Sequence, residues 1–361
     1  MRIAILTPSV TSGDAVSNDV LGMYDVLNEK GATVRLFAEG WTLHQPAIVP
    51  WQKIERFLKK PTDILIYHYS RGWAPGLDLL RKLDCRKVVK YHNVTPPEFV
   101  ARYSPDFAEI CREGRQQLTP IARSGSDLYL SASAYNMQEL IAEGAAQSRS
   151  FVVPPFHHID RLHSIASDLA VLNSYEDGKT NILMVGRVSP NKGHPALIAA
   201  FAAYHHDYNR NSHLVIVGKE ERRLARYSEL LREMIHRLKL QDAVVFTGEV
   251  SDHALRAYYQ VAHVFMITSD HEGFCVPLVE AMSMRLPIIA YASSAIPETV
   301  GDAGLVWDER NPYYLAESIN AIVKNQSLRR ALAEKGRQRY EQHFTNRETE
   351  AKFLAALREV L

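Results

Sequence analysis

Two glutamates, Glu272 and Glu280, stand eight residues apart in a run that suits a ligand with both charge and hydroxyl groups. Gly273 permits a loop after Glu272, and a proline four residues further favours the start of a helix. Backbone N–H groups in the first turn of that helix would face an anion. Both carboxylates could accept hydrogen bonds from sugar hydroxyls. The alternative is that Glu272 is an ordinary loop charge and Glu280 a helix acid with a structural partner.

Two cations, Arg187 and Lys192, lie five residues apart between Gly186 and Gly193. Guanidinium and ammonium groups on a glycine-flanked loop beside a helix start suit a diphosphate. The alternative is a pair of solvated surface cations, the usual state of Lys and Arg. The order of residues is not that of a Walker loop. Because an apolar run ends just before Gly186, we favour the diphosphate interpretation.

Two features of the first half could serve the same ligand. Gly13 follows the first apolar run and allows a tight turn into a helix whose N-terminus can hold an anion. An ordinary loop is the alternative there, and the dinucleotide-binding fingerprint is absent. His92 also follows an apolar run, where a lone histidine can be structural or can take part in chemistry at the same crevice. His157 and His158 are interpreted instead as solvated surface histidines.

The elements that must position these residues are short apolar runs that alternate with helical patterns. The runs are continuous, as in strands of a parallel sheet that is covered on both faces. This alternation predicts the α/β class, with two doubly wound parallel sheets whose ligands bind beyond the carboxyl ends of the strands. The predicted strands are Ile3–Leu6, Val34–Phe37, Ile64–Tyr67, Val88–Tyr91, Leu128–Ser131, Phe151–Val153, Ile182–Val185, Leu214–Val217, Val244–Phe246, Val264–Ile267, Ile288–Tyr291 and Leu305–Trp307. The predicted helices include Pro195–Tyr204, Arg222–Leu238 and His253–Gln260.

A chain of 361 residues suits two domains. The segment between Pro154 and Thr180 contains a polar stretch of weak periodicity, which predicts the linker. We expect domains at residues 1–165 and 166–340, followed by a C-terminal helical segment at 341–361.

Composition narrows the function classes. Hydrophobic residues make up 46% and charged residues 23%, as in ordinary globular proteins. The formal net charge of +1 argues against a nucleic-acid binder, which needs a basic excess. The 3 cysteines fit neither a disulfide framework nor a zinc site, and favour a reducing compartment.

The sequence also bears on localisation. No segment has the form of a signal peptide, and no run approaches the ~18 apolar residues of a membrane span, so we expect a cytoplasmic protein. Residues Trp51–Lys60 predict a basic amphipathic helix, which could contact an anionic membrane at its cytoplasmic face. A solvated helix packed on its own sheet is the favoured alternative.

The run from Glu272 to Glu280 resembles the E-x7-E segment of retaining GT-B glycosyltransferases of the GT4-like group, the glycosyl transferases group 1. The resemblance spans most of Thr180–Gly304 and is thinner in the first half. Beyond the two glutamates it is carried by the phosphate loop Gly186–Gly193, the base-side loop Gly248–Val250, the strand and turn Pro287–Glu298, the Gly13 loop and Tyr91–Asn93.

The resemblance implies two Rossmann-like domains facing a central cleft, an acceptor-side domain first and a nucleotide-sugar-binding domain second. The final helix, Arg347–Leu361, would cross back to the first domain. Arg187 and Lys192 would neutralise the donor diphosphate, Glu280 would accept the ribose hydroxyls, and Glu272 would grip the donor sugar. The catalytic set implied is His92, Glu272, Arg187 and Lys192. The donor-binding set implied is Gly13, Arg187, Lys192, Val250, Glu272, Gly273, Phe274, Cys275, Val276, Leu278, Val279 and Glu280.

The activity implied is transfer of a hexosyl group, mannose or a related sugar, from a nucleoside diphosphate sugar to a hydroxyl of a glycan or lipid-linked acceptor. Anomeric configuration would be retained, and the setting would be bacterial surface-polysaccharide assembly. GDP-mannose and UDP-hexoses are both compatible donors. No D-x-D triplet is present, so neither a metal nor another cofactor is expected. The alternatives are another GT-B enzyme, such as a sugar-nucleotide epimerase or a phosphorylase, and a non-catalytic sugar-nucleotide-binding subunit.

Two positions depart from the group's pattern. Cys275 stands where the group usually has glycine, and we expect this small side chain to preserve the loop. The interdomain segment Val153–Asp160 lacks the group's turn glycine, so we expect the hinge or the acceptor side to differ.

Overall fold

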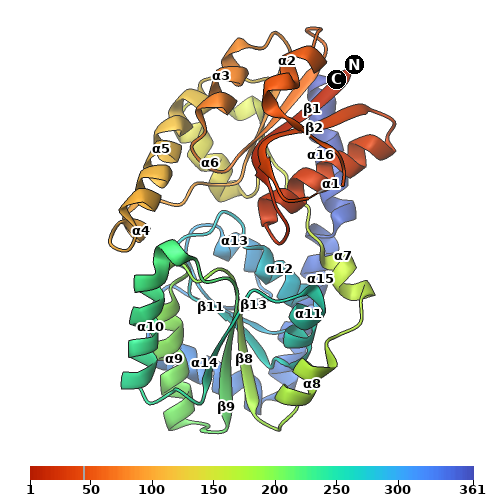
Figure 1. The fold of residues 1–361 in the computed structure, drawn as a ribbon. Coiled ribbons are helices and arrows are strands. Elements are labelled where there is room, and N and C mark those ends of the chain that lie inside the picture. The colour runs from red at the N-terminus through yellow and green to blue at the C-terminus, as the bar shows by residue number, and fades with distance from the viewer. Residues whose placement is uncertain (44) are drawn as a thin grey trace. The chain divides into compact units, whose positions relative to one another are not determined.

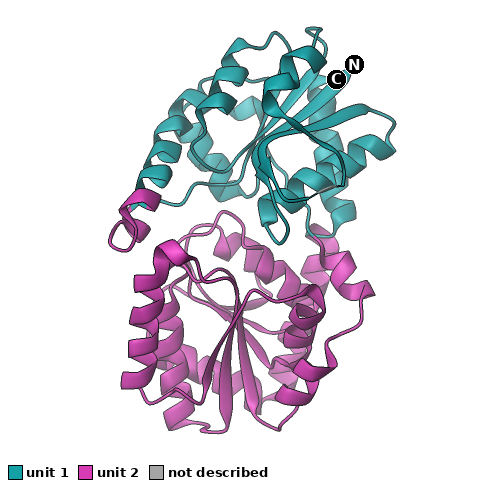
Figure 2. Cartoon of the chain, in the orientation of Figure 1, with its two compact units in different colours: residues 1–97, 108–157, 344–361 teal, residues 98–107, 158–343 magenta. Residues whose placement is uncertain are grey.

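The structure, a computed structural model, describes residues 1–43 and 45–361 and forms two compact units (Figures 1 and 2). Unit 1 comprises residues 1–97, 108–157 and 344–361, and unit 2 comprises residues 98–107 and 158–343. The C-terminal segment thus belongs to the same unit as the N-terminus. The units differ from the expected domain ranges chiefly at residues 98–107 and 158–165, which belong to unit 2.

Unit 1 is built on a seven-stranded sheet in the order β3-β2-β1-β4-β5-β6-β7, with every neighbouring pair parallel. All six strands predicted in the first half are present. The short edge strand β3 was not predicted, because its three residues end at a proline and carry little apolar pattern. The strands are β1 (Arg2–Val10), β2 (Thr33–Trp41), β3 (Ile48–Pro50), β4 (Ile64–Tyr69), β5 (Arg86–Tyr91), β6 (Leu128–Ser131) and β7 (Ser150–Val152).

Helices cover both faces of this sheet, and each face has its own apolar cluster. The last helix, α16, contributes Phe353 and Leu357 to one of them. Burial on both sides explains why the strands read as continuous apolar runs. The helices are α1 (Ala15–Glu29), α2 (Ile54–Phe57), α3 (Ala74–Lys82), α5 (Pro105–Ala122, which begins in unit 2), α6 (Ala134–Ala142) and α16 (Asn346–Leu357), with 3-10 turns η1 (Trp51–Lys53), η2 (Gln147–Arg149) and η5 (Arg358–Val360).

The basic helix expected over Trp51–Lys60 is a 3-10 turn followed by the four-residue helix α2. Its apolar side chains Ile54, Phe57 and Leu58 are buried in the core of unit 1. These apolar side chains therefore pack inside unit 1, which agrees with the favoured alternative of a segment packed on its own sheet.

Unit 2 is built on a six-stranded sheet in the order β10-β9-β8-β11-β12-β13, again with parallel neighbours. All six strands predicted in the second half are present, so the prediction of two doubly wound α/β sheets is confirmed. The strands are β8 (Thr180–Val185), β9 (Ser212–Val217), β10 (Val244–Gly248), β11 (Val264–Ile267), β12 (Ile288–Tyr291) and β13 (Gly304–Trp307).

The helices of unit 2 include the three predicted ones, which appear as α9, α10 and α11. They are α4 (Glu98–Ala101), α7 (Ile159–Ser164), α8 (Leu169–Tyr175), α9 (His194–Asp207), α10 (Ala225–Arg237), α11 (Asp252–Val261), α12 (Val276–Ser283), α13 (Ile296–Val300), α14 (Pro312–Lys324) and α15 (Gln326–His343), with 3-10 turns η3 (Pro190–Lys192) and η4 (Arg222–Leu224).

Residues 98–107 belong to unit 2 because aromatic contacts hold them there. The Tyr103 ring packs edge-on against Tyr227, with centroids 5.1 Å apart. The guanidinium of Arg223 lies 3.6 Å from the centroid of the Phe107 ring. These contacts could not be read from the sequence, since their partners lie more than a hundred residues apart.

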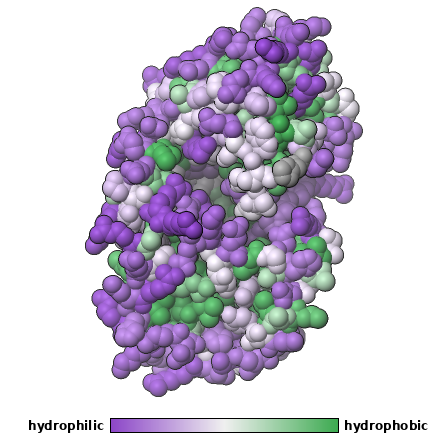
Figure 3. Space-filling view, in the orientation of Figure 1, coloured by the Kyte–Doolittle hydropathy of each residue, from purple (hydrophilic) through white to green (hydrophobic). Residues whose placement is uncertain are grey.

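Hydrophilic residues predominate on the face drawn in Figure 3, and hydrophobic residues form patches of limited size there. Within the described part of the chain, no helix combines the length and the apolar character needed to cross a bilayer.

Candidate functional site

The predicted diphosphate loop and the paired glutamates follow adjacent strands, β8 and β11, at the centre of the unit 2 sheet. The strand order reverses between β8 and β11. Strands β9 and β10 lie on the β8 side of this point, whereas β12 and β13 lie on the β11 side. Such a switch point leaves a crevice at the carboxyl ends of the strands, where ligands of doubly wound sheets bind. The fold thus brings two sequence-distant loops to the expected place.

Hydrogen bonds tie the two loops together. Backbone N–H of Asp270 donates to the Asn191 carbonyl over 2.8 Å, and the Asn191 amide donates to the His271 carbonyl over 3.2 Å. The Thr268 hydroxyl donates to the Gly193 carbonyl over 2.9 Å. Gly193 has φ +65°, and a Cβ there would lie 1.9 Å from the Thr268 carbonyl oxygen. Only glycine permits this approach, which holds the two loops in register.

Lys192 and Glu272, predicted from separate motifs, form an ion pair. The Lys192 ammonium lies 2.7 Å from Oε1 and 2.8 Å from Oε2 of Glu272. The Ser269 hydroxyl donates to Oε1 over 2.7 Å. The two side chains are only 17% and 7% exposed, respectively. A cation and a carboxylate are therefore held in fixed positions beside each other at the strand ends.

Arg187 is placed differently from Lys192. Its side chain is 59% exposed and pairs with Glu221 over 3.0 Å. An exposed pair of this kind contributes little to stability, because water and salt screen it. The guanidinium can therefore exchange Glu221 for an anionic ligand at low cost.

Glu280 is buried in α12, eight residues after Glu272, which lies in the loop before this helix. The Tyr259 hydroxyl donates to its Oε2 over 2.6 Å, and Nε2 of His158 lies 3.7 Å from its Oε1. Burial raises the pKa of the Glu280 carboxyl, while the nearby His158 and the Tyr259 hydrogen bond oppose that rise. A buried carboxylate with two polar neighbours suits recognition of hydroxyl groups.

The interpretation of His157 and His158 as solvated histidines is wrong. His158 faces Glu280, and its side chain is only 25% exposed. His157 is buried in unit 1, where its Nε2–H donates to the Phe344 carbonyl over 2.7 Å. Neither partner is near in sequence, so an adjacent pair of histidines carried no signal of them.

Hydrogen bonds from the segment that follows β12 hold the loop before α12 in place. Glu272 N–H donates to the Ser294 hydroxyl over 2.7 Å, and the Thr299 hydroxyl donates to the Phe274 carbonyl over 2.9 Å. Cys275 is the N-cap residue of α12 and has φ +74°, a backbone conformation that residues other than glycine seldom adopt. The loop thus keeps a glycine-like conformation with a cysteine in place.

Not every residue of the donor-binding set can offer its side chain. Leu278 and Val279 are fully buried in the core of unit 2. The Leu278 N–H already donates to the Cys275 carbonyl over 3.0 Å. This N–H group is therefore already engaged inside the protein. Val250 follows the edge strand β10, which β9 and β8 separate from β11.

In unit 1, Gly13 lies in the exposed turn between β1 and α1, with φ +72°. Asp14 caps α1, where its Oδ2 accepts hydrogen bonds from Ser17 N–H over 3.0 Å and from the Ser17 hydroxyl over 2.9 Å. This carboxylate already satisfies part of the helix N-terminus, which leaves fewer N–H groups for an external anion than the sequence suggested.

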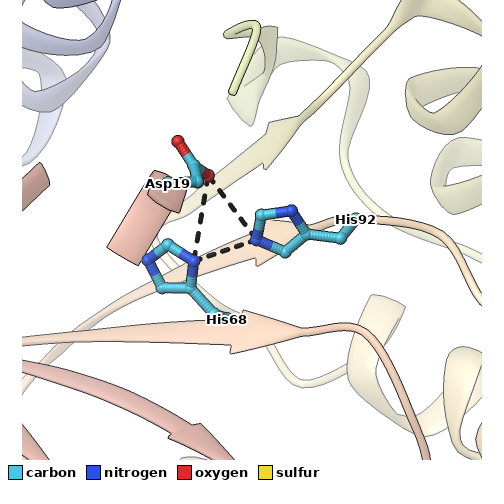
Figure 4. Close-up of side chains that lie close together, drawn as sticks. All are labelled: Asp19, His68 and His92. Atoms are coloured by element: carbon cyan, nitrogen blue, oxygen red, sulfur yellow. Dashed lines mark hydrogen bonds and ion pairs between the residues drawn. The ribbon is translucent and has the colours of Figure 1, made fainter. Parts of the chain in front are cut away.

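His92 follows β5 and belongs to a buried cluster that sequence reasoning missed (Figure 4). Its Nε2 lies 2.9 Å from Nδ1 of His68, which is in β4, and 3.5 Å from Oδ2 of Asp19, which is in α1. The ammonium of Lys90 lies 3.7 Å from the same Asp19 oxygen. Ionisable residues inside the apolar runs of β4 and β5 were the one available signal of this cluster.

Burial controls the charges in the cluster. It lowers the pKa of His68 and of His92 well below the usual value, and the positive charge of Lys90 adds to this. Burial also raises the pKa of Asp19 and lowers that of Lys90, while their mutual attraction opposes both shifts. The Lys90 and Asp19 side chains thus lie 3.7 Å apart, beside two imidazoles whose neutral forms are favoured.

Within residues 1–43 and 45–361, one group offers ligand atoms near enough to hold a metal ion: Asp19, His68 and His92. The Lys90 ammonium, however, already lies where it balances the Asp19 carboxylate. A divalent cation there would leave excess positive charge in a buried place, which is costly.

The chain is similar to known glycosyltransferases. The family model described as "Glycosyl transferases group 1" matches residues 158–339, about half of the chain. A Mycobacterium tuberculosis protein named GDP-mannose-dependent alpha-(1-6)-phosphatidylinositol monomannoside mannosyltransferase is 29% identical over 61% of this chain and 60% of its own length. The Escherichia coli O-antigen chain mannosyltransferase B is 27% identical over 75% of this chain and 68% of its own.

Solved structures agree on the fold. A sucrose-phosphate synthase from Thermosynechococcus elongatus matches with a TM-score of 0.77 over 100% of this chain and 99% of that chain, at 17% identity. A likeness at this identity shows the fold alone, and it confirms the predicted GT-B class. The family match is more specific, since it covers both loops of the unit 2 site. The chain therefore belongs to the glycosyl transferases group 1 family, as its resemblance to the GT4-like group predicted.

Proposed function

We propose that the chain is a retaining, metal-independent hexosyltransferase that moves mannose or a related sugar from a nucleoside diphosphate sugar to a hydroxyl of a glycan or lipid-linked acceptor. The observation that carries the proposal is the Lys192–Glu272 ion pair at the switch point of unit 2. The pair holds an ammonium group, which can bind phosphate, directly beside a carboxylate, which can accept hydrogen bonds from sugar hydroxyls. The junction between a diphosphate and its sugar suits such a pair.

The proposed roles follow from the chemistry of each group. Arg187 and Lys192 bind the diphosphate and stabilise the negative charge that grows on it as the sugar leaves. Glu280, held by Tyr259 and His158, accepts hydrogen bonds from the ribose hydroxyls. Glu272 binds a hydroxyl of the donor sugar through the lone pairs that Lys192 and Ser269 leave available. In unit 1, His92 contacts the reacting sugar.

In the proposed reaction, the bond between the anomeric carbon and the diphosphate oxygen breaks, and the acceptor oxygen bonds to the same carbon from the same face. The leaving phosphate takes the acceptor's hydroxyl proton, so no protein nucleophile is required. Two cations on one loop meet the charge of the leaving group, which is why we propose that no metal is needed.

GDP-mannose is the favoured donor, and surface-polysaccharide assembly the favoured setting. Support for both comes from the names of relatives, which are 27% to 29% identical to this chain. The protein would work in the cytoplasm. Any attraction to an anionic membrane would come from the exposed Lys53, Arg56, Lys59 and Lys60, because the apolar side chains of this segment are buried.

The proposal is tested by incubating the protein with GDP-mannose or UDP-glucose and methyl mannoside, with either EDTA or Mg²⁺. Acceptor-dependent release of nucleoside diphosphate in EDTA, with retained configuration in the product, is the expected result. Loss of activity in EDTA and its return with Mg²⁺ would contradict metal independence. Epimerised donor, or sugar phosphate formed from inorganic phosphate, would favour the two enzymatic alternatives. Binding of a sugar nucleotide without turnover would favour a non-catalytic subunit.

A further inference from the structure

His68 has no role in the function proposed above, yet it makes the closest polar contact of the His92 ring among the described residues. Its Nδ1 lies 2.9 Å from Nε2 of His92. The two rings are stacked, with centroids 5.1 Å apart and planes 21° from parallel. Figure 4 shows the two nitrogens pointing toward each other, with the Asp19 carboxylate above them.

The contact requires the two imidazoles to have complementary protons. Both rings are buried and neutral at neutral pH, so each carries a single N–H. In a nitrogen–nitrogen hydrogen bond one ring donates and the other accepts. Either His68 donates from Nδ1, or His92 donates from Nε2.

The far nitrogen of His68 distinguishes the two arrangements. His68 Nε2 is buried, and no residue that the structure describes forms a hydrogen bond with it. If His68 accepted at Nδ1, its single proton would be on Nε2, as an unpaired donor inside the core. If His68 donates from Nδ1, only a lone pair is left unpaired at Nε2. Buried unpaired N–H groups are the rarer and costlier case, so donation from Nδ1 of His68 is favoured.

We propose that His68 is a positioning residue: by donating from Nδ1 to Nε2 of His92, it fixes the His92 proton on Nδ1. His92 then meets its ligand as a hydrogen-bond donor, which suits an oxygen acceptor such as a hydroxyl of the transferred sugar. The contact with that sugar rests on the proposed function, whereas the position of the proton does not.

The pairing of Asp19 with Lys90 keeps this arrangement in place. Asp19 Oδ1 accepts a hydrogen bond from the Phe156 N–H over 2.8 Å, and the Lys90 ammonium donates to the Val153 carbonyl. Asp19 Oδ2 lies 3.5 Å from Nε2 of His92 and 3.8 Å from Nδ1 of His68. Its negative charge favours a proton between the two rings, and the positive charge of Lys90 disfavours a second one.

The first test is the ring nitrogen spectrum of the unliganded protein labelled with ¹⁵N-histidine. His92→Gln assigns the His92 signals by their loss. The expected result is a protonated Nδ1 and an unprotonated Nε2 for His92 at pH 7. A His92 ring protonated at Nε2, or at both nitrogens, would overturn the proposal. This measurement needs no turnover, so its outcome is independent of whether the chain proves to be a transferase.

The second test compares two His68 variants. His68→Asn keeps an N–H donor near the position of Nδ1, whereas His68→Leu removes it. We expect kcat to fall about 10- to 100-fold in His68→Leu, the scale of a misplaced catalytic group, and to recover most of that loss in His68→Asn. His68→Asn should also keep the His92 proton on Nδ1. Val89→Ala, a buried change on the neighbouring strand, controls for lost packing. Equal losses in the Asn and Leu variants, or no loss in either, would contradict a positioning role.

Discussion

The Lys192 ammonium lies within 2.8 Å of both carboxylate oxygens of Glu272, although the two residues are separated by 80 positions in the chain. Sequence motifs assign the cation to a phosphate and the acid to a sugar. The structure makes them one ion pair in which each fixes the other. Their contributions to stability and to ligand binding are therefore linked, which single substitutions of either residue will reveal.

Lys192→Met should lower both donor affinity and stability. It leaves the Glu272 carboxylate nearly buried without its cation, at a cost of about 2–3 kcal/mol. Adding Glu272→Gln removes the uncompensated charge, so the double variant should regain most of the stability but none of the affinity. Urea unfolding and calorimetric titration with nucleoside diphosphate measure the two effects separately. A stable Lys192→Met single variant would mean that the pair is not structural.

Arg187→Ala should leave stability within about 0.5 kcal/mol of the wild type, since its pair with Glu221 is exposed. Donor affinity should nevertheless fall at least tenfold, because a charge-assisted contact to the diphosphate is lost. Arg222→Ala, which removes a neighbouring arginine of unit 2, is the matched control and should bind donor normally. Unchanged affinity in Arg187→Ala would exclude this residue from the diphosphate site.

Donor affinity should depend on pH through Glu280. Burial raises its pKa above the usual 4.5, so the carboxylate needed for the ribose hydroxyls is lost at a higher pH than for an exposed glutamate. Affinity should be full above the raised pKa and should fall as the pH drops through it. The stability contribution has the opposite sign: ionised Glu280 costs stability, and that cost is relieved as the pH falls toward 4.5.

In His158→Leu the fall in donor affinity at low pH should begin at a higher pH, because His158 opposes the rise in the Glu280 pKa. His163→Leu changes an exposed histidine of α7, the helix that begins directly after His158, and should leave the pH dependence of affinity unchanged. The measurement is the dissociation constant of nucleoside diphosphate between pH 4.5 and pH 8. Identical profiles for wild type and His158→Leu would remove His158 from the site.

Lys90→Met should destabilise unit 1 by about 3–5 kcal/mol, because it leaves the Asp19 carboxylate buried without its cation. Lys90→Met combined with Asp19→Asn removes both charges and should recover most of the loss. A double-mutant cycle of unfolding free energies checks this. Additive losses would show that the two residues do not act as a pair.

The fold was predictable because each central strand is covered on both faces and leaves a continuous apolar run. The run ending at Val185 and the run ending at Ile267 placed the loops of Lys192 and Glu272 at strand ends, so the sequence could predict their position at one edge of the sheet. The strand β3 has only three residues, too few for a recognisable apolar pattern. The sequence also left open whether the apolar side of Trp51–Lys60 contacts a membrane or the protein core, and the structure shows it in the core.

The cluster around His92 could not be predicted in the same way. Asp19, His68 and His92 come from three elements that meet only because β1 and β4 are neighbours at the switch point of the unit 1 sheet. The spacing of these residues in the sequence does not indicate that they lie close together. His158 was misread for a related reason: its partner Glu280 follows more than a hundred residues later, and only the folded unit brings them within 3.7 Å.

The most direct test of the donor site is the thermal stability of the protein with UDP, GDP, ADP, CMP and dTDP, each with EDTA and with Mg²⁺. A diphosphate at 100 times its dissociation constant should add about 2.7 kcal/mol of stability. We predict that one nucleoside diphosphate, GDP if mannose is the sugar, stabilises the wild type in EDTA, and that the Lys192→Met/Glu272→Gln variant does not respond. The same shift in wild type and variant, or no shift with any nucleotide, would contradict the assignment of the Lys192–Glu272 pair to the donor.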